Sequence, residues 1–284
     1  MNSSNDALRR ASALYDALLG RDLDEGARRA VEARAASGTD VGFSFAMELI
    51  CSVEFTDKLL ARVIDAHLAL IHRARQLMVR RLLPPAASII DLGGINAPLF
   101  KLGYPHPFER MVIVDLPPDD RHELYRDIRL DAPSDADVYL RYCDMTRLDP
   151  FANESFDLVW SGQSIEHVDA EAGARMCAEA YRVLRPGGLF CLDTPNRGFT
   201  SIHTRDVGGG FIHPEHKHEY HVAELRDLLS RTGFDVAQER GICEMPKTRS
   251  SGRFDYEDFV LGSPIVDDPE AAYIMYFAAC KPRD

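Results

Sequence analysis

The stretch SIIDLGGINAPLF, residues 88–100, decides the fold. A short apolar run ends in an acidic residue and two glycines, which is the pattern of a buried strand that turns sharply at its carboxyl end. The next such run, MVIVDL at residues 111–116, ends with the carboxylate of Asp115. Backbone amides after one parallel strand and a carboxylate after the next are where α/β sheets hold nucleotide-like ligands. The two runs predict such a sheet and site, although the fingerprint GxGxxG is absent.

Further runs of the same texture predict a doubly wound sheet of seven strands. They occupy residues 88–92, 111–116, 138–144, 156–161, 188–194, 234–242 and 271–281. Between the fourth and fifth runs we expect a helix that begins at Asp169 and is stopped by Pro186. Another is expected over residues 222–231, closed by Gly233. Residues 243–270 are polar and punctuated by Pro and Gly, and we expect them to be an insertion.

The first part of the chain has a different pattern. Apolar residues recur every three or four positions over residues 7–83, which predicts helices and no strand. We therefore expect three parts: an all-helical N-terminal module over residues 1–56, a connecting helix over residues 57–85 and an α/β domain over residues 86–284.

The amino-acid composition disfavours several classes of function. The 284 residues include 33 basic and 45 acidic ones, and the net charge of −12 would repel a nucleic acid backbone. The start of the chain does not resemble a secretory leader, and no apolar run approaches the roughly 18 residues of a membrane span. We therefore expect a cytoplasmic protein. The six cysteines are scattered with no CxxC pair, which predicts reduced thiols without a catalytic or ligand role.

Five motifs, in order, resemble those of class I S-adenosylmethionine-dependent methyltransferases. They are IIDLGG (89–94), VIVDL (112–116), CDMTRLDPFANESFDLVWSGQSIEHV (143–168), YRVLRPGGLFCLDTPN (181–196) and HVAELRDLLSRTGFDV (221–236). The resemblance covers residue 86 to the end of the chain. It implies a Rossmann-like fold and S-adenosylmethionine as the methyl donor.

The resemblance also implies eight cofactor-binding residues, which serve the methionine part, the ribose, the adenine and the sulfonium in turn. They are Asp91, Gly93 and Gly94, then Asp115, then Asp144 and Met145, then Ser161 and Gln163. The sequence departs from the family in the glycine loop, where Ile95 and Ala97 replace two glycines. That departure leaves the path of the loop open.

The stretch FIHPEHKHEYH, residues 211–221, holds four histidines and two glutamates. Histidine serves as metal ligand, as proton-transfer group or as an ordinary polar residue, so the stretch alone leaves all three open. It follows the fifth predicted strand, whereas SGQSIEHVD, residues 161–169, follows the fourth. Because the carboxyl ends of parallel strands meet at one edge of the sheet, both stretches should face one cleft.

The two stretches together resemble the metal-dependent small-RNA 3′-terminal 2′-O-methyltransferases and, more loosely, the ubiquinone-pathway O-methyltransferases. Those enzymes pair an ExxEH motif with a DHxFEW-like segment, which QSIEH and EHKHEY match. The resemblance implies four ligands for Mg²⁺ or Mn²⁺: Gln163, Glu166, His167 and His216. Gln163 replaces a glutamate, so the site would bind a cation more weakly.

The catalytic residues that we predict are all histidines. His167 and His216 would hold the metal or contact the acceptor, and His213 and His218 are candidate general bases. Two alternatives stay open for His167 and His216: a metal-free role in acceptor binding or base catalysis, and a purely structural role. Glu219 and His221 are expected at the start of the following helix.

The segment over residues 14–55, which runs from LYDALLGRDLDEG to SVEF, resembles a bacterial helical module of unknown function that often occurs beside glycan-processing enzymes. We therefore predict an S-adenosylmethionine-dependent O-methyltransferase. Its acceptor would be a hydroxyl of a sugar, a glycan precursor or a glycosylated small molecule. The alternatives are a metal-free methyltransferase of a phenolic or carboxylic natural product, and a noncatalytic binding protein with the same fold.

Overall fold

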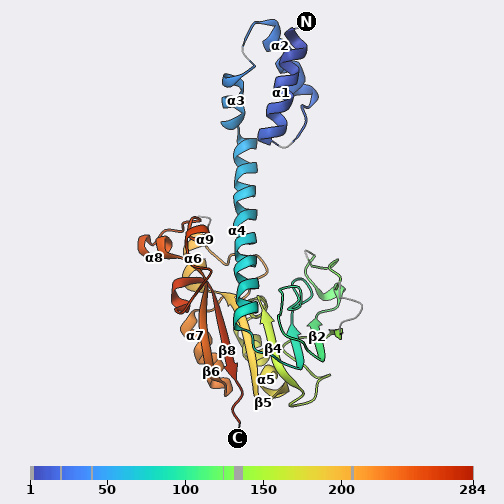
Figure 1. Ribbon diagram of the computed structural model, residues 1–284, viewed down its shortest axis with the longest axis vertical. Helices are drawn as coiled ribbons and strands as arrows, with labels where there is room; N and C mark the ends of the chain where they lie inside the picture. Colours follow the sequence, from blue (N-terminus) through green and yellow to red (C-terminus); the bar gives the residue numbers. More distant parts are fainter. Residues whose placement is uncertain are drawn as a thin grey trace. The chain divides into compact units, whose positions relative to one another are not determined.

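The computed structural model describes residues 3–19, 21–39, 41–123, 125–130, 137–205 and 208–283. The chain forms two compact units, Met1–Ala69 and Leu70–Asp284. The division falls inside the long helix α4 (Val53–Leu82) (Figure 1). Within the described ranges, no helix has the length and apolarity needed to cross a membrane.

The Met1–Ala69 unit is helical, as the apolar periodicity predicted. It contains α1 (Ser3–Leu19), α2 (Glu25–Ala36), α3 (Phe43–Ile50) and the first part of α4. The apolar stripes bury a small core that includes Ala11, Leu19 and Val31. Asp24 caps α2 by accepting a hydrogen bond from the Ala27 backbone N–H at 2.7 Å.

The Leu70–Asp284 unit is built around an eight-stranded sheet in the order β3-β2-β1-β4-β5-β8-β6-β7 (Figure 1). The strands are β1 (Ser88–Leu92), β2 (Arg110–Asp115), β3 (Val138–Tyr142), β4 (Phe156–Gly162), β5 (Leu184–Pro195), β6 (Asp235–Glu244), β7 (Ile265–Val266) and β8 (Ala272–Cys280). The first five are parallel, and β8 runs antiparallel between β5 and β6. The chain leaves β1 toward β2 and returns to β4, so the strand order reverses there, where such sheets bind ligands.

Helices cover both faces of this sheet, which confirms the doubly wound prediction. They are α5 (Ala170–Val183), α6 (Arg197–Arg205), α7 (Val222–Thr232), α8 (Pro246–Ser251) and α9 (Asp258–Leu261), with the 3-10 turns η1 (Pro118–Asp120), η2 (Ile165–His167) and η3 (Pro269–Ala271). On one face α5 and α7 bury Met176 and Leu225, and on the other the end of α4 buries Met78. Asp169 caps α5 and Gly233 ends α7 with a φ of 105°, both as predicted.

The eighth strand corrects the prediction of seven. β7 has only two residues, too few to show the alternation that identifies a strand in sequence. It pairs with Gly241 and Ile242 of β6. A Cβ on Gly241 would stand 2.8 Å from a methyl carbon of Val266, so the bare glycine allows this close pairing.

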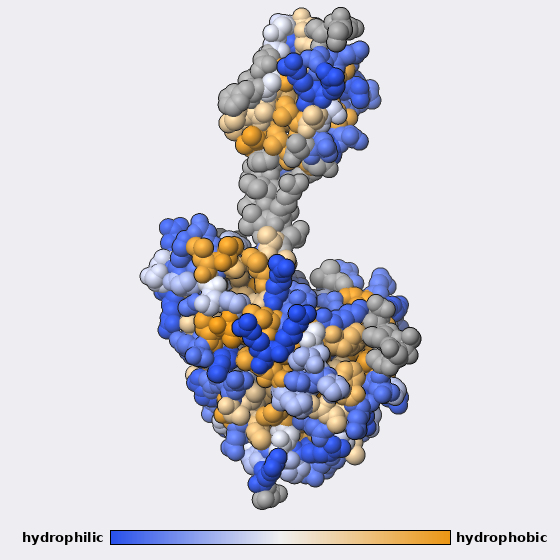
Figure 2. All heavy atoms as spheres, in the orientation of Figure 1, coloured by the Kyte–Doolittle hydropathy of each residue, from blue (hydrophilic) through white to orange (hydrophobic). Residues whose placement is uncertain are grey.

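The expected insertion at residues 243–270 is ordered and contains α8, α9 and β7. The fully buried carboxylate of Asp258 accepts hydrogen bonds from the backbone N–H groups of Lys247 and Thr248 at 2.9 and 2.8 Å, which caps α8. Because this segment is rich in turn residues, the sequence pattern did not predict its short helices. Figure 2 shows an orange, hydrophobic patch in the region of α9. The exposed apolar residues of α9 are Val260, which is 71% exposed, and Leu261.

Candidate active site

The turn after β1 requires its two glycines. Gly93 has a φ of 72°, and its N–H donates to the carbonyl of Val114 at 2.8 Å. A Cβ on Gly93 would lie 2.6 Å from Ser164 Oγ, and one on Gly94 would lie 2.4–2.5 Å from the carboxyl atoms of Asp91. The backbone therefore passes so close to Asp91 and Ser164 that only glycine fits.

Asp91, at the end of β1, has an unused oxygen. The side chain is fully buried, and Oδ2 accepts from the Leu99 N–H at 2.7 Å. Oδ1 is buried with no hydrogen-bond partner in the described part of the chain. Burial raises the pKa of this carboxyl to about 7. An unpaired buried carboxylate oxygen is costly, so this atom indicates a ligand that donates to it.

Asp115, at the end of β2, explains the departure in the glycine loop. Its Oδ2 accepts from the backbone N–H of Ile95 at 3.1 Å, and its Oδ1 accepts from Leu116 N at 2.9 Å. The Ile95 side chain is buried in the domain. The isoleucine therefore supplies the backbone amide that the loop needs, while its side chain adds apolar packing.

The predicted adenine residues follow β3. Asp144 is exposed, and its Oδ1 accepts from both the N–H and the hydroxyl of Thr146 at 2.8 Å each. The half-buried Met145 places its sulfur 4.0 Å from the position that a Cβ on Gly93 would occupy. The loops after β1 and β3 therefore meet, as a shared cofactor site requires.

The predicted sulfonium residues end β4. Ser161 is fully buried, and Gln163 has a left-handed φ of 57° while its N–H donates to the Asp193 carbonyl at 2.9 Å. Ser161 Oγ and Gln163 Nε2 are both buried without a partner among the described residues, as are Asp91 Oδ1 and Glu166 Oε1. Four unsatisfied polar atoms at the carboxyl ends of β1 and β4 indicate a built ligand site.

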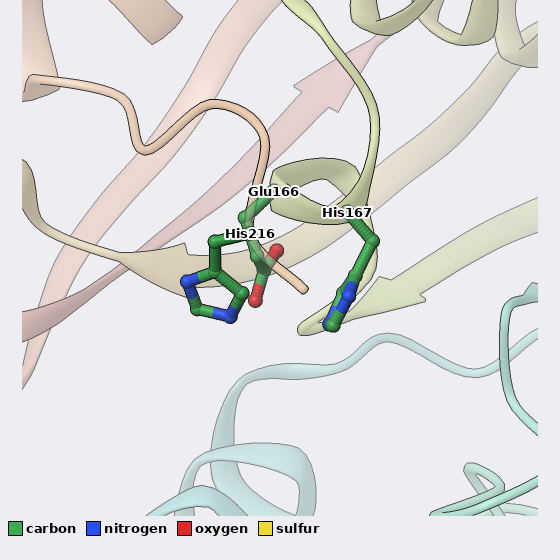
Figure 3. A group of neighbouring side chains, drawn as sticks. All are labelled: Glu166, His167 and His216. Carbon is green, nitrogen blue, oxygen red and sulfur yellow. The ribbon is translucent and has the colours of Figure 1, made fainter. Parts of the chain in front are cut away.

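Glu166, His167 and His216 form a trio in which ligand atoms, one from each residue, all lie within 4.8 Å of one another. Glu166 and His167 come from η2, and His216 comes from the loop before α7. Figure 3 shows the carboxyl of Glu166 between the two imidazole rings. Glu166 is fully buried, and only its Oε2 has a partner within the described ranges, the Thr194 hydroxyl at 3.0 Å. Burial raises the pKa of Glu166 to about 7.

His216 is oriented by Glu219. Its Nδ1 lies 2.8 Å from Glu219 Oε1. Burial tends to raise the pKa of Glu219, but hydrogen bonds from His216, Thr200 and the Ile212 backbone outweigh it and lower the pKa. Because an ionised carboxylate only accepts, Nδ1 carries a hydrogen, and in the neutral ring Nε2 is therefore the nitrogen with the lone pair. Nε2 is thus the nitrogen available to a metal or an acceptor.

Glu219 corrects a prediction, because it does not belong to the start of α7. It is a buried hub that also accepts from Ile212 N at 2.9 Å, Arg197 Nη1 at 3.1 Å and the Thr200 hydroxyl. His221 is the N-cap of α7, and its N–H donates to Glu224 Oε2 at 3.3 Å. The sequence pattern did not distinguish Glu219 from Glu224, since both stand near the start of α7.

His167 is held in its neutral form. Burial, together with the nearby His216 and His213, lowers its pKa to about 4, although a hydrogen bond with the Glu215 backbone acts in the opposite direction. Its ring stands edge-on to that of His216, with the centroids 5.0 Å apart. A neutral imidazole in this position can act as a ligand at neutral pH.

The two predicted general bases lie in different places. The His213 ring is 5.4 Å from that of His216 and 6.0 Å from that of His167. Its Nε2 lies 3.4 Å from the Tyr125 hydroxyl, and its Nδ1 accepts from Glu215 N at 3.2 Å. Because Nδ1 accepts from a backbone N–H, the neutral ring carries its hydrogen on Nε2, on the side of Tyr125. His213 lies beside the trio, and a proton that its ring takes up would go to Nδ1 in exchange for the contact with Glu215.

His218 is directed toward α7. Its Nε2 lies 2.6 Å from Glu224 Oε1, and its ring packs edge-on against Tyr220 with the centroids 4.4 Å apart. The backbone of this part of the loop contacts the trio instead, since the N–H groups of Lys217 and His218 donate to the Glu166 carbonyl at 2.8 and 3.2 Å.

Sequence reasoning missed a buried ion pair below the site. Arg75 of α4 donates to Asp193 at the end of β5, with Nε–Oδ2 and Nη2–Oδ1 distances of 2.5 and 3.1 Å. A Cβ on Gly162 would lie 2.8 Å from Arg75 Nη2. Asp193 could have been found, because it ends a parallel strand. Arg75 could not, because α4 carries several arginines at similar positions.

Residues 93–192 match the family described as "Methyltransferase domain". A protein of Mycolicibacterium smegmatis described as "Probable S-adenosylmethionine-dependent methyltransferase" is 38% identical over 105 residues, which make up 37% of this chain and 38% of that protein. The chain thus matches less than two fifths of the length of that relative.

Solved structures share the fold. A chain of the complex between the Haloferax volcanii Trm112 methyltransferase activator and a methyltransferase superposes with a TM-score of 0.55 at 19% identity, covering 80% of this chain and 96% of that one. The small RNA methyltransferase HEN1 gives a TM-score of 0.51 at 16% identity, covering 79% of this chain and 25% of that one. At these identities the likeness shows the fold alone.

The reversed strand order, the glycine turn after β1 and the solved structures define the fold of the Leu70–Asp284 unit. It is the Rossmann-like fold of class I S-adenosylmethionine-dependent methyltransferases, and its residues 93–192 match the methyltransferase domain family.

Proposed function

We propose that this chain is an O-methyltransferase that transfers a methyl group from S-adenosylmethionine to a hydroxyl of a sugar, a glycan precursor or a glycosylated small molecule, with a divalent cation at the acceptor side. The observation that carries the proposal is the trio of Glu166, His167 and His216 beside the cofactor edge of the sheet.

The cofactor-side residues fit S-adenosylmethionine, which supplies a methyl group activated on a sulfonium. The unpaired Oδ1 of Asp91 can accept from the cofactor's amino group, and the Asp115 carboxylate lies where a ribose binds in such sheets. The glycine turn leaves room for the cofactor close to the backbone. Ser161 and Gln163, with unpaired polar atoms in the described part of the chain, border the reacting end.

The trio fits a divalent cation. One carboxylate and two imidazoles suit Mn²⁺, Fe²⁺ or Zn²⁺, and Mg²⁺ less well, because Mg²⁺ prefers oxygen ligands. Glu219 behind His216 is the kind of carboxylate that orients a histidine ligand. Gln163 would add a neutral carbonyl oxygen, and acceptor hydroxyls would complete the coordination. The cation would orient the acceptor and lower the pKa of its hydroxyl.

We assign different roles to the histidines. His167, with a pKa of about 4, is too weak a base to take a proton efficiently near neutral pH, and it suits a ligand role better. His213 lies beside the trio, and burial lowers its pKa, so its neutral ring can receive the acceptor's proton. His218, which faces Glu224, has no place in this scheme.

A sugar-type acceptor accords with the surroundings of the trio. The groups next to it include the rings of His213 and Tyr125 and the polar contact between His122 Nε2 and Glu215 Oε1, which lie 3.1 Å apart. Such groups can donate hydrogen bonds to several hydroxyls, and accept them, at the same time. The net charge of −12 disfavours RNA, and the resemblance of the N-terminal module supports a glycan context.

The full-length chain should be tested by radiolabel transfer from S-adenosylmethionine to a panel of glycosides and sugar nucleotides. We expect methylation that EDTA abolishes and Mn²⁺ or Mg²⁺ restores. Undiminished transfer in EDTA would support the metal-free alternative in its place. If calorimetry detects no binding of S-adenosylhomocysteine at millimolar concentration, the fold is noncatalytic and both enzymatic hypotheses fail.

A further inference from the structure

Arg121 lies directly against the carboxylate that we assign to the ribose. It ends η1 and is buried, with its Nε 3.2 Å from Asp115 Oδ1. The same Nε donates to the Leu116 carbonyl at 2.7 Å, and Nη1 donates to the Ile128 carbonyl at 3.2 Å. None of the five methyltransferase motifs includes this arginine, so the sequence pattern does not distinguish it.

The remaining terminal nitrogen of Arg121 is unsatisfied. Nη2 is buried and has no hydrogen-bond partner in the described ranges. An aromatic face lies nearby, that of Tyr142, whose ring centroid is 5.6 Å from the guanidinium carbon. Buried guanidinium donors are rarely left unpaired, because their desolvation is costly. An orphaned donor beside the ribose carboxylate indicates that a ligand oxygen completes the set.

The charges around Asp115 give Arg121 a second task. Burial raises the pKa of Asp115, and the Ile95 N–H, Arg121 and the Leu116 N–H act against it. Asp91 also faces Asp115, and its own pKa is raised in part by Asp115. The buried Asp91 and the half-buried Asp115, at adjacent strand ends, repel each other when ionised, and the positive charge of Arg121 in contact with Asp115 offsets that repulsion.

Arg121 also joins the two ends of the segment 116–128, through its bonds to Leu116 and Ile128. That segment carries His122 and Tyr125, which contact Glu215 and His213 on the acceptor side. An arginine with a purely structural role would act only through this clamp, that is, through its hydrogen bonds to the Leu116 and Ile128 carbonyls. The experiment therefore has to separate the clamp from an effect on Asp115.

We propose that Arg121 is a positioning residue for the cofactor: it holds the Asp115 carboxylate ionised and oriented for the ribose hydroxyls and offers a further donor to the nucleoside. The inference rests on the proposed function, because it assumes that Asp115 binds the ribose of S-adenosylmethionine.

The test is calorimetric binding of S-adenosylhomocysteine to the full-length chain and to four variants, namely Arg121→Gln, Arg121→Lys, Asp115→Asn and the double variant Arg121→Gln/Asp115→Asn. We expect Arg121→Gln to raise the Kd about 10-fold, the worth of one charge-assisted hydrogen bond. Arg121→Lys, which keeps the charge, should recover part of the loss. The double variant should lose less affinity than the two single losses added together, because part of the arginine's effect passes through that carboxylate.

Arg226→Gln is the matched control, since Arg226 forms a bidentate pair with Glu239 between α7 and β6, away from Asp115. Its affinity should equal that of the wild type. The inference is overturned if Arg121→Gln binds as the wild type does, or if its loss adds in full to that of Asp115→Asn, which is the result of a clamp alone. If Arg121→Gln does not fold, equal affinities of Arg121→Lys and the wild type overturn it. Absence of binding to the wild type instead overturns the proposed function, and the inference with it.

Discussion

The two halves of the site are constructed differently. On the proposed cofactor side, Asp91 and Asp115 stand at the ends of adjacent strands, and backbone N–H groups hold both carboxylates. On the proposed acceptor side, η2 and the loop over residues 211–221 come from distant parts of the sequence, and the buried Glu219 orients His216 of that loop. The first half depends on a turn and the second on a side-chain hub. A substitution in one half should therefore weaken ligand binding there and leave ligand binding in the other half intact.

The largest expected effect comes from removing one proposed metal ligand of the trio, which tests whether the two halves bind their ligands independently. His216→Ala should lower the affinity for Mn²⁺ by about 100-fold or more, since even a supporting partner is worth about 10- to 100-fold. The affinity for S-adenosylhomocysteine should stay unchanged. Calorimetry with each ligand measures both. His218→Ala is the matched control from the same loop, because His218 faces Glu224, and it should bind Mn²⁺ normally.

The reverse experiment targets the turn. Gly94→Ala places a methyl group within 2.4–2.5 Å of the Asp91 carboxyl, which must move from its bond with Leu99. Overpacking and the lost charged contact cost about 3 kcal/mol together, or about 100-fold in cofactor affinity. Binding of Mn²⁺ should persist. The comparison fails if the variant loses both ligands while its melting temperature is unchanged. Gly26→Ala, in α2 of the other unit, serves as the control.

A smaller effect on Mn²⁺ affinity is expected when Glu219, which orients His216, is substituted. Glu219→Gln keeps the size of the side chain but removes the charge that fixes the Nδ1–H of His216, so Mn²⁺ affinity should fall about 10- to 100-fold. Glu215→Gln, which changes a half-buried glutamate of the same loop, is the matched control. Equal Mn²⁺ affinities of the two variants would show that Glu219 serves the loop and not the metal.

The smallest effect concerns pH. Because burial raises the pKa of Asp91 to about 7, the folded state binds this proton more tightly than the unfolded state. The contribution of Asp91 to stability therefore falls as pH rises from about 4 to 7. A cofactor ammonium needs the ionised form, so the affinity for S-adenosylhomocysteine should increase up to about 10-fold between pH 6 and 8. Asp91→Asn should abolish most of this dependence, whereas Glu166→Gln should retain it.

The same contrast explains what could be predicted from the sequence. Strand ends followed by carboxylates and glycines identified β1 and β2, and they pointed to the residues that we assign to the cofactor, because those contacts are local. The histidine stretch pointed to His216 through its place after β5, but not to the hub role of Glu219, whose partners Arg197 and Thr200 belong to α6. Arg75 and Arg121 lie among many arginines with the same helical or turn context, and only the tertiary fold distinguishes them.

The most direct test of the central claim is a crystal structure of the full-length chain grown with S-adenosylhomocysteine and Mn²⁺, using anomalous scattering to locate the metal. The account predicts a manganese peak coordinated by Glu166, His167 and His216 Nε2, with the ribose of the cofactor on Asp115. A bound cofactor with no anomalous peak at the trio, or with His216 turned away from Glu219, would contradict it.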